Sequence, residues 1–260
     1  MIETKNLTKL YSKSKAVDDV SFNIASGEIV GLLGHNGAGK TTIMKMLTGY
    51  LEPNSGTILI DKLDIAEQRA EVQNRIGYLP ENCPFYPDMT VIDFLDYAAG
   101  LKGLSGAASN RAVRTAIDRM ELRDKATQTI QTLSKGYRQR VGVAKAILTQ
   151  PVILIFDEPT NGLDPSQIQH MRDMILDMAK HSTVILSTHI LREVQAVCDR
   201  VLIIRDGRLA VDSKIEDLEK GQRLVLVIDQ SPDHAKAALS GIEGVNSVEF
   251  LQAANGRNHY

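Results

Sequence analysis

Short apolar stretches alternate with amphipathic ones along most of the chain. The apolar stretches are typical of β-strands, and several are apolar at every position, as expected for strands that helices cover on both faces. They are SFNI, EIVGLLG, TILI, RIGYLP, VILIFDEP, TVILSTH and RVLIIRDGRL. This alternation predicts an α/β fold with a sheet that is parallel at its centre.

Between residues 82 and 132 the strand pattern disappears and helical periodicity replaces it. In MTVIDFLDYAAGL, apolar residues recur at helical spacing, and Thr90 is placed to cap the helix, with Asp93 three residues further on. RAVRTAIDRMEL continues the helical pattern. We therefore predict an all-helical subdomain, about 82–132, inserted into the α/β core.

The pattern changes again after about residue 218. RLVLVID and VNSVEFL are typical of strands, and SPDHAKAAL is typical of a helix with proline at its first position. They predict a small βαβ-type unit at 219–260. Asn255-Gly256 is a strong hairpin-turn signal, but only residues 257–260 follow it. We expect that a further strand is missing and the chain is truncated; a frayed polar tail is the alternative.

Composition narrows the function classes. The 260 residues are 43% hydrophobic, enough for one substantial globular unit and a small appended one. Because 30 Lys and Arg balance 32 Asp and Glu, we expect no nucleic-acid partner. Cys83 and Cys198 lack metal-binding spacing, which predicts free, packed thiols in a reducing compartment. There is neither a signal peptide nor an apolar run of roughly 18 residues, so a membrane span would have to come from another chain.

A glycine-rich segment, GLLGHNGAGKTT, lies between an apolar strand and a helical stretch. It has the GxxxxGK[ST] spacing of a phosphate-binding loop. Its glycines let backbone N–H groups point at phosphate, where the helix dipole also favours an anion. Lys40 can reach the β- and γ-phosphates, Thr41 can bind Mg²⁺, and Thr42 can contact phosphate. The residues expected to hold the nucleotide here are Gly34, His35, Asn36, Gly37, Ala38, Gly39, Lys40, Thr41 and Thr42.

Two further strands end in groups suited to catalysis. VILIFDEPT ends in Asp157 and Glu158, and TVILSTH ends in His189. Ligands gather at the carboxyl ends of strands in open α/β sheets, so we expect these side chains to face the phosphate loop. Asp157 suits Mg²⁺ through its water shell, Glu158 suits a general base or orienter for the attacking water, and His189 suits a contact to that water or to phosphate. Alone, a DE pair is more often a helix cap and a lone histidine is usually structural.

These motifs, with LSKGYRQR and NGLD in this order, closely resemble the nucleotide-binding subunits of ATP-binding cassette (ABC) transporters, over residues 1–218. The resemblance implies a P-loop NTPase core with a mostly parallel central sheet, an antiparallel β subdomain and an inserted helical subdomain. It places Tyr11 against adenine and Asp164 at the interface between two subunits. It also makes Asp157, Glu158 and His189 the Walker B aspartate, the catalytic glutamate and the switch histidine.

In the family, two subunits dimerise head to tail, and the LSKGYRQR helix of each caps the γ-phosphate held by the other. Ser134 and Gly136 match the family's phosphate contacts. Lys135 replaces a glycine of the common LSGGQ pattern, in a first helical turn where the dipole disfavours a cation. One hypothesis is that nucleotide compensates this charge when the dimer closes. The alternative is that the long stem carries the ammonium into solvent.

A second departure is Glu81, which stands where the family usually has the Q-loop glutamine. A carboxylate there could bind Mg²⁺ or its water, but it adds charge near the γ-phosphate. Both departures resemble members that serve multidrug, sodium, gliding-motility or copper-related export permeases. The next segment, NCPFYPDMT, lies where the family receives a coupling helix of the permease. Its Phe85, Tyr86 and Met89 suit a protein interface or the local core.

The sequence thus predicts an ATPase, with ATP and Mg²⁺ as cofactors, that dimerises around two nucleotides and powers a separate membrane permease. By the resemblance we expect an exporter, a homodimer with no nucleic-acid partner, and a cytoplasmic location on the inner face of the cell membrane. The alternatives are a non-transport ABC ATPase acting on DNA or ribosomes, and a nucleotide-gated regulatory module.

Overall fold

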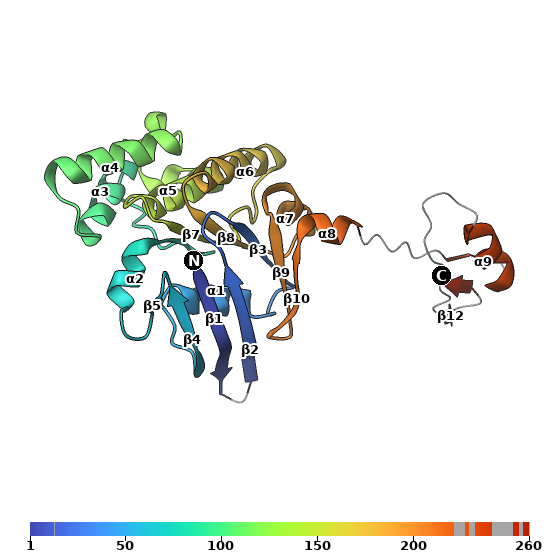
Figure 1. The fold of residues 1–260 in the computed structure, drawn as a ribbon. Coiled ribbons are helices and arrows are strands. Elements are labelled where there is room, and N and C mark those ends of the chain that lie inside the picture. Colours follow the sequence, from blue (N-terminus) through green and yellow to red (C-terminus); the bar gives the residue numbers. More distant parts are fainter. Residues whose placement is uncertain (13, 221–226, 229–231, 241–251, 255–256, 260) are drawn as a thin grey trace. The chain divides into compact units, whose positions relative to one another are not determined.

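The structure, a computed structural model, describes residues 1–12, 14–220, 227–228, 232–240, 252–254 and 257–259. The chain divides into two compact units, Met1–Ile215 and Glu216–Tyr260 (Figure 1). The first unit contains all the residues for which the sequence predicts a role in ATP chemistry.

A six-stranded sheet in the order β10-β9-β3-β8-β7-β6 forms the centre of the first unit. All its neighbouring strands are parallel except β10, which runs antiparallel to β9 at the edge. Every residue of β7 and β8 is buried, which explains the apolar runs ILIF and VIL within them, and the pairing of the strands confirms the predicted parallel centre. The strands are β3 (Ile29–Leu33), β6 (Ile76–Leu79), β7 (Ile153–Asp157), β8 (Thr183–Thr188), β9 (Arg200–Arg205) and β10 (Arg208–Lys214).

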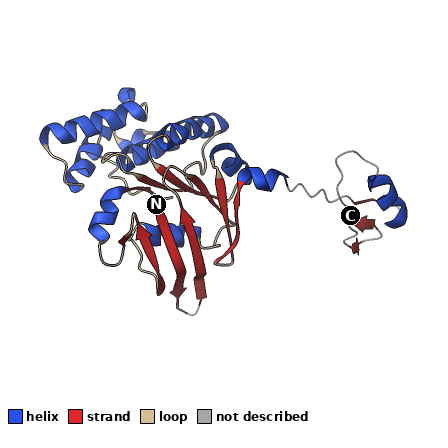
Figure 2. Ribbon diagram, viewed as in Figure 1, coloured by secondary structure: helices blue, strands red, loops and turns tan. Residues whose placement is uncertain are grey.

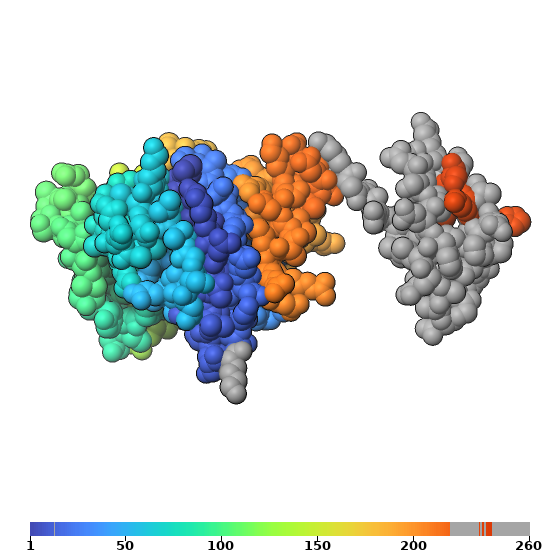
Figure 3. All heavy atoms as spheres, turned by 60° about the horizontal axis from the view of Figure 1, so that its bottom comes forward, coloured from blue at the N-terminus to red at the C-terminus, as the bar shows by residue number. Residues whose placement is uncertain are grey.

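A second sheet, wholly antiparallel, has the order β2-β1-β4-β5. Arg208, at the start of β10, joins the two sheets, because its Nη2 lies 2.6 Å from Oδ2 of Asp18 on β2. In Figure 3 the N-terminal strands (dark blue) accordingly lie beside the segment near residue 200 (orange). The strands are β1 (Ile2–Tyr11), β2 (Ser14–Ile24), β4 (Ser55–Ile60) and β5 (Leu63–Asp64).

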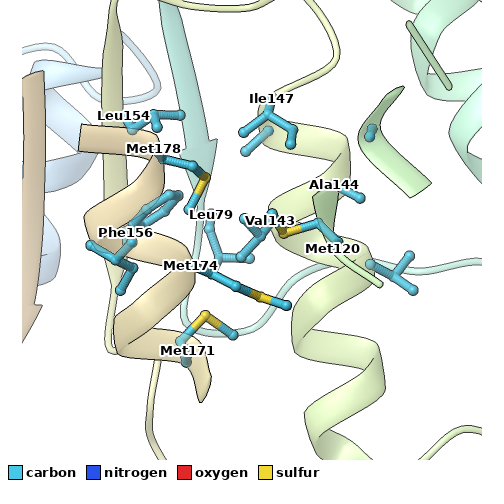
Figure 4. Close-up of a cluster of buried hydrophobic side chains, with 14 of the residues drawn as sticks. Leu79, Met120, Val143, Ala144, Ile147, Leu154, Phe156, Met171, Met174 and Met178 are labelled. Atoms are coloured by element: carbon cyan, nitrogen blue, oxygen red, sulfur yellow. The ribbon is translucent and has the colours of Figure 1, made fainter. Parts of the chain in front are cut away.

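The side chains of β7 alternate between two separate cores. Ile153 and Ile155 join the cluster between the two sheets, which includes helix α1. Leu154 and Phe156 join a second cluster with helices α3 to α7. Figure 4 shows part of the second cluster, where Phe156 lies among methionines of α6. Because neighbouring residues of a strand point to opposite faces, a parallel strand covered on both sides is apolar along most of its length.

Figure 2 shows the helices of the first unit around these sheets. They are α1 (Lys40–Leu47), α2 (Arg69–Arg75), α3 (Val91–Leu101), α4 (Gly106–Arg119), α5 (Lys135–Ala146), α6 (Pro165–Ala179), α7 (Leu191–Val197) and α8 (Ile215–Lys220), which crosses into the second unit. Two 3₁₀ turns, Arg123–Lys125 and Ile130–Thr132, follow α4. Residues 82–132 thus contain α3, α4 and the two turns, and no strand of either sheet.

The start of α3 follows from its capping residue. Thr90 has an extended backbone, its Oγ1 accepts a hydrogen bond from the backbone N–H of Asp93 at 3.2 Å, and the same hydroxyl donates to Asp93 Oδ2 at 2.6 Å. The predicted N-cap is therefore confirmed. The next helix starts at Gly106, five residues before the RAVRTAIDRMEL stretch, and ends at Arg119.

In the second unit, helix α9 (Pro232–Ser240) begins with Pro232, as predicted. Strands β11 (Val227–Ile228) and β12 (Gln252–Ala254) both pair antiparallel with β13 (Arg257–His259), so β11 and β12 run in the same direction, as in a βαβ unit. A short strand, β13, follows Asn255-Gly256 and pairs with β12, and the expected truncation stays a prediction. The predicted strand VNSVEFL lies outside the described residues.

Both cysteines are free thiols, as predicted. Cys198 is buried, and burial raises its pKa to about 12; burial likewise raises the pKa of the half-buried Cys83. Across the described ranges, no helix combines the length and the apolar character that a membrane span needs.

Candidate functional site

The phosphate loop connects β3 to α1 and places Lys40 at the first position of the helix. Gly39 caps α1 in a left-handed conformation with φ at 108°, which disfavours side chains other than hydrogen. A Cβ there would also collide with the backbone oxygen of Ala16 on β2. Glycine is therefore required at this position for two separate reasons.

The Lys40 ammonium lies at the centre of the site and is only 6% exposed. It donates hydrogen bonds to the backbone oxygens of Gly34, at 2.7 Å, and His35, at 3.3 Å. Its third polar neighbour is Glu158, whose Oε1 lies 3.3 Å from Nζ and whose side chain is 8% exposed. The loop therefore holds the cation against the carboxylate that follows β7.

Glu158 has a left-handed backbone, with φ at 50°, which is costly for a residue that carries a Cβ. Ser187 of β8 secures this conformation, because its backbone oxygen (3.2 Å) and its Oγ (3.0 Å) both accept from the Glu158 N–H. His189 Nδ1 lies 3.0 Å from Glu158 Oε2. The ends of β3, β7 and β8 thus bring Lys40, Glu158 and His189 into one connected set.

Asp157, the last residue of β7, is completely buried. Ser187 Oγ donates to its Oδ1 at 2.5 Å, whereas Oδ2 is buried and has no hydrogen-bond partner among the described residues. An unsatisfied buried carboxylate oxygen is costly, and a magnesium ion or its water shell would satisfy it. The environment of Asp157 also affects Tyr78 on the neighbouring strand β6. Burial, followed by the charge of the Asp157 carboxylate, raises the pKa of the Tyr78 hydroxyl.

The described residues contain no group of three or more His, Cys, Asp or Glu side chains that could hold a metal by themselves. This agrees with the chemistry of Mg²⁺, which is commonly held by one or two carboxylates together with substrate phosphates and water. The residues present therefore fit Mg²⁺ bound together with a nucleotide, and they do not form an all-protein metal cage.

A pocket of about 550 Å³ opens over the phosphate loop. Asn161 and Ala16 belong to its wall, although sequence analysis did not select them. Asn161 Nδ2 donates to Glu81 Oε1 at 3.4 Å and so connects the residues after β7 to the Q-loop position. Ala16 lies on β2, in a different segment of the sequence from the phosphate loop. The pocket is lined by Ala16, Asn36, Gly37, Gly39, Lys40, Thr41, Thr42, Glu81, Glu158, Asn161 and His189.

Other predicted residues lie outside this lining. Tyr11 is 49% exposed at the end of β1, opposite Ser14. His35 is also exposed, and its Nε2 lies 3.8 Å from Oδ1 of Asp206. Gly34 packs against the backbone of Ile204, and Ala38 is fully buried in the core between the sheets.

The remaining predicted residues form a second group, at the starts of α5 and α6. Ser134 caps α5, and its Oγ accepts from the Tyr137 N–H at 3.4 Å. Asp164 caps α6 in the same way, since its Oδ1 accepts from the Gln167 N–H at 2.9 Å. That bond, followed by one from the Ser166 hydroxyl, lowers the pKa of Asp164. The helices α5 and α6 therefore begin at neighbouring positions, and the N–H groups of a first helical turn have no acceptor within their own helix.

Two close contacts join this second group. A Cβ on Gly136 would lie 2.8 Å from the amide carbon of the Gln167 side chain, so α5 and α6 approach each other closely there. A Cβ on Gly162 would collide with Nζ of Lys135. The exposed Lys135 side chain therefore lies across the loop that precedes α6, with its Nζ close to Gly162.

This geometry can be compared with known proteins. The sequence model of the family described as "ABC transporter" matches residues 17–161. The bacitracin transport ATP-binding protein BcrA of Bacillus licheniformis is 37% identical over 241 residues, which are 92% of this chain and 78% of BcrA. Among solved structures, an ATP-binding subunit of an ABC transporter matches with a TM-score of 0.76 and 32% identity, covering 85% of this chain and 92% of its own.

A second solved structure, the dimeric bacterial ABC transporter cassette MJ0796, has a TM-score of 0.76 at 25% identity and covers 83% of this chain and 99% of its own. The sequence match extends through the phosphate loop and the DE pair, and the structural match covers most of the first unit's fold. The chain therefore belongs to the ABC transporter family as an ATP-binding subunit, and it is an ATPase.

Proposed function

We propose that this ATPase subunit closes around two ATP–Mg²⁺ with a second cassette and powers a separate membrane permease that exports its substrate. The observation that carries the chemical part is the connected set of Lys40, Glu158 and His189 at the ends of three neighbouring strands. A cation for phosphate, a base for water and a second hydrogen-bonding group are what phosphoryl transfer to water requires.

For nucleotide binding, we assign Lys40 to the β- and γ-phosphates and the N–H groups of the phosphate loop to the same charges. Thr41, Asp157 and Glu81 would hold Mg²⁺, which neutralises phosphate charge when it is bound. Thr42 would contact phosphate, and Tyr11 would stack on adenine from the end of β1.

For hydrolysis, Glu158 would accept a proton from the attacking water, and His189 would orient that water or the γ-phosphate. The 3.0 Å contact between Glu158 and His189 supports this pairing. Both side chains are held by strand ends and backbone hydrogen bonds, so the rate would depend mainly on positioning and preorganised charge.

ABC ATP-binding subunits dimerise and associate with permeases, and MJ0796 is a dimeric cassette. We therefore assign Ser134, Lys135 and Gly136 to the γ-phosphate held by a second copy of this chain, and Asp164 to the interface. The helix N-terminus capped by Ser134 favours an anion there. A homodimer completes two identical sites, which fits a single chain that carries both halves of the site.

Lys135 is expected to connect nucleotide binding to this dimerisation. Its ammonium stands in the first turn of α5, where a cation is disfavoured by roughly 0.3–1 kcal/mol until an anion arrives. Lys135→Gly should therefore weaken ATP-driven dimerisation of the Glu158→Gln protein and reduce its salt dependence. Analytical ultracentrifugation across a salt series measures both effects. Unchanged dimerisation and salt dependence would show that the stem simply holds the charge in solvent.

A role in transport is supported by BcrA, whose name states bacitracin transport. We assign the docking surface to the exposed aromatic side chains near the Q-loop position. Tyr86 is 51% and Tyr97 is 42% exposed, and their rings make an edge contact with centroids 5.5 Å apart. Phe85 instead packs against Phe94 in the helical core, so it belongs to the packing beneath this surface and not to the exposed aromatic side chains.

The docking prediction can be tested by purifying the tagged Glu158→Gln protein from native membranes with ATP–Mg²⁺, followed by mass spectrometry. We expect a multi-span membrane protein that is lost with Tyr86→Ala. Leu176→Ala is the matched control, because Leu176 is an exposed apolar residue of α6, in a different segment of the chain. Recovery of ribosomes or DNA-bound proteins would contradict the transporter function and favour a non-transport ATPase.

On this proposal the protein works in the cytoplasm, at the inner face of the cell membrane. The ATPase domain would span residues 1–218, with the helical subdomain at about 82–132. Residues 219–260 would form a small accessory segment.

A further inference from the structure

Glu193 is a buried acid outside the nucleotide pocket. It stands in the first turn of α7 and is 6% exposed. Its Oε2 accepts two hydrogen bonds, from Thr160 Oγ1 at 2.8 Å and from Thr188 Oγ1 at 2.7 Å. Both threonines are themselves buried, so one carboxylate oxygen joins two loops inside the protein.

The two threonines flank the residues to which we assign hydrolysis. Thr160 follows Glu158 by two positions, and Thr188 immediately precedes His189. Thr188 Oγ1 also accepts from the N–H of Ile190 at 3.1 Å, so this hydroxyl fixes the backbone on both sides of His189. Glu193 therefore connects the loop of the general base to the loop of the histidine.

A buried carboxylate makes this connection at a cost in folding free energy. Burying one is costly, and no cation pairs with Glu193 in the part of the chain that the structure describes. Its neighbours on α7, Val194 and Val197, fill the same core with apolar side chains. An apolar residue would suit packing alone, whereas only an acceptor with two free lone pairs can hold two hydroxyl groups at one point.

We propose that Glu193 is a positioning residue for ATP hydrolysis, which fixes the loops of Glu158 and His189 at the separation their contact requires. The inference rests on the roles proposed above for those two residues. Without Glu193, the hydroxyls of Thr160 and Thr188 would lose their common acceptor and the two loops could move independently. The bond between His189 and Glu158 would then be made only part of the time.

We expect substitutions of Glu193 and its two threonine partners to lower the rate of ATP turnover and to leave ATP binding unchanged, because the described hydrogen bonds of Glu193 involve no residue of the phosphate loop. Glu193→Ala, Thr160→Val and Thr188→Val should each lower kcat by about ten- to a hundred-fold, the cost of small misplacements. The KM for ATP should stay within about three-fold. Glu193→Gln should restore most of kcat, since the amide oxygen can accept both hydroxyl groups.

The matched control is Val197→Ala, which trims another buried side chain of α7 and leaves kcat near the wild-type value. Thermal unfolding of every variant confirms that it is folded. The decisive measurement is a double-mutant cycle: in a His189→Ala background, Glu193→Ala should cost less than about three-fold more, because Glu193 acts through the contact between His189 and Glu158.

Full additivity in that cycle, or a Glu193→Gln protein as slow as Glu193→Ala, would overturn the inference. So would Glu193→Ala behaving like Val197→Ala. Glu158→Gln, measured in the same series, separates this failure from failure of the proposed function. If Glu158→Gln abolishes turnover and the Glu193 variants do not, the catalytic assignment stands and only the positioning role falls.

Discussion

Glu158→Gln should slow ATP hydrolysis by about a thousand-fold and leave ATP affinity within about three-fold of the wild type. The change keeps the size of the side chain and one oxygen, so the contacts to Lys40 and His189 can persist. What it removes is the ability to accept a proton from water. The left-handed backbone at Glu158 is fixed by Ser187 through main-chain contacts, so the substitution should leave it in place.

Steady-state phosphate release and equilibrium binding of a fluorescent ATP analogue measure the two quantities separately. Glu67→Gln is the control, since Glu67 is an exposed acid that lies outside the pocket. If Glu158→Gln retained more than about a tenth of the activity, Glu158 would be an orienting group at most and another base would have to be found.

The sequence predicted the site well where chemistry follows directly from position on a strand. The run VILIF is typical of a strand buried on both faces, and its end was expected at the carboxyl edge of the sheet with the phosphate loop. Glu158 and His189, which follow β7 and β8, line the pocket over the phosphate loop, and Asp157 is the buried last residue of β7. The cap at Thr90 could be predicted in the same way, because capping depends on residues only three positions apart.

Features that depend on tertiary contacts could not be predicted. Ala16 reaches the pocket only because β2 crosses the phosphate loop, and nothing in its own sequence surroundings marks it. The contact between Lys135 and Gly162 joins segments that are 27 positions apart. Glu193 looks like an ordinary exposed acid of a helical stretch until the structure buries it against two hydroxyl groups.

Lys40→Met should abolish tight ATP binding, with a loss of affinity of at least about a hundred-fold, because a buried ammonium contributes several kcal/mol to phosphate binding. The substitution also leaves Glu158 without its cation. Both side chains are more than nine-tenths buried, so the free energy of unfolding without ATP should fall by about 3 kcal/mol, the cost of breaking a buried pair from one side.

These two effects of Lys40→Met can be separated with a second substitution. In Lys40→Met/Glu158→Gln, residue 158 is no longer charged and no longer needs the missing cation, so stability without ATP should return to within about 1 kcal/mol of the wild type. ATP affinity should stay low, because the phosphates have still lost their cation. Thermal unfolding with and without ATP–Mg²⁺ measures both, and Lys45→Met, an exposed lysine on the same helix, is the control. If the double variant regained ATP affinity, Lys40 would serve mainly to neutralise Glu158, and phosphate binding would rest on the backbone of the loop alone.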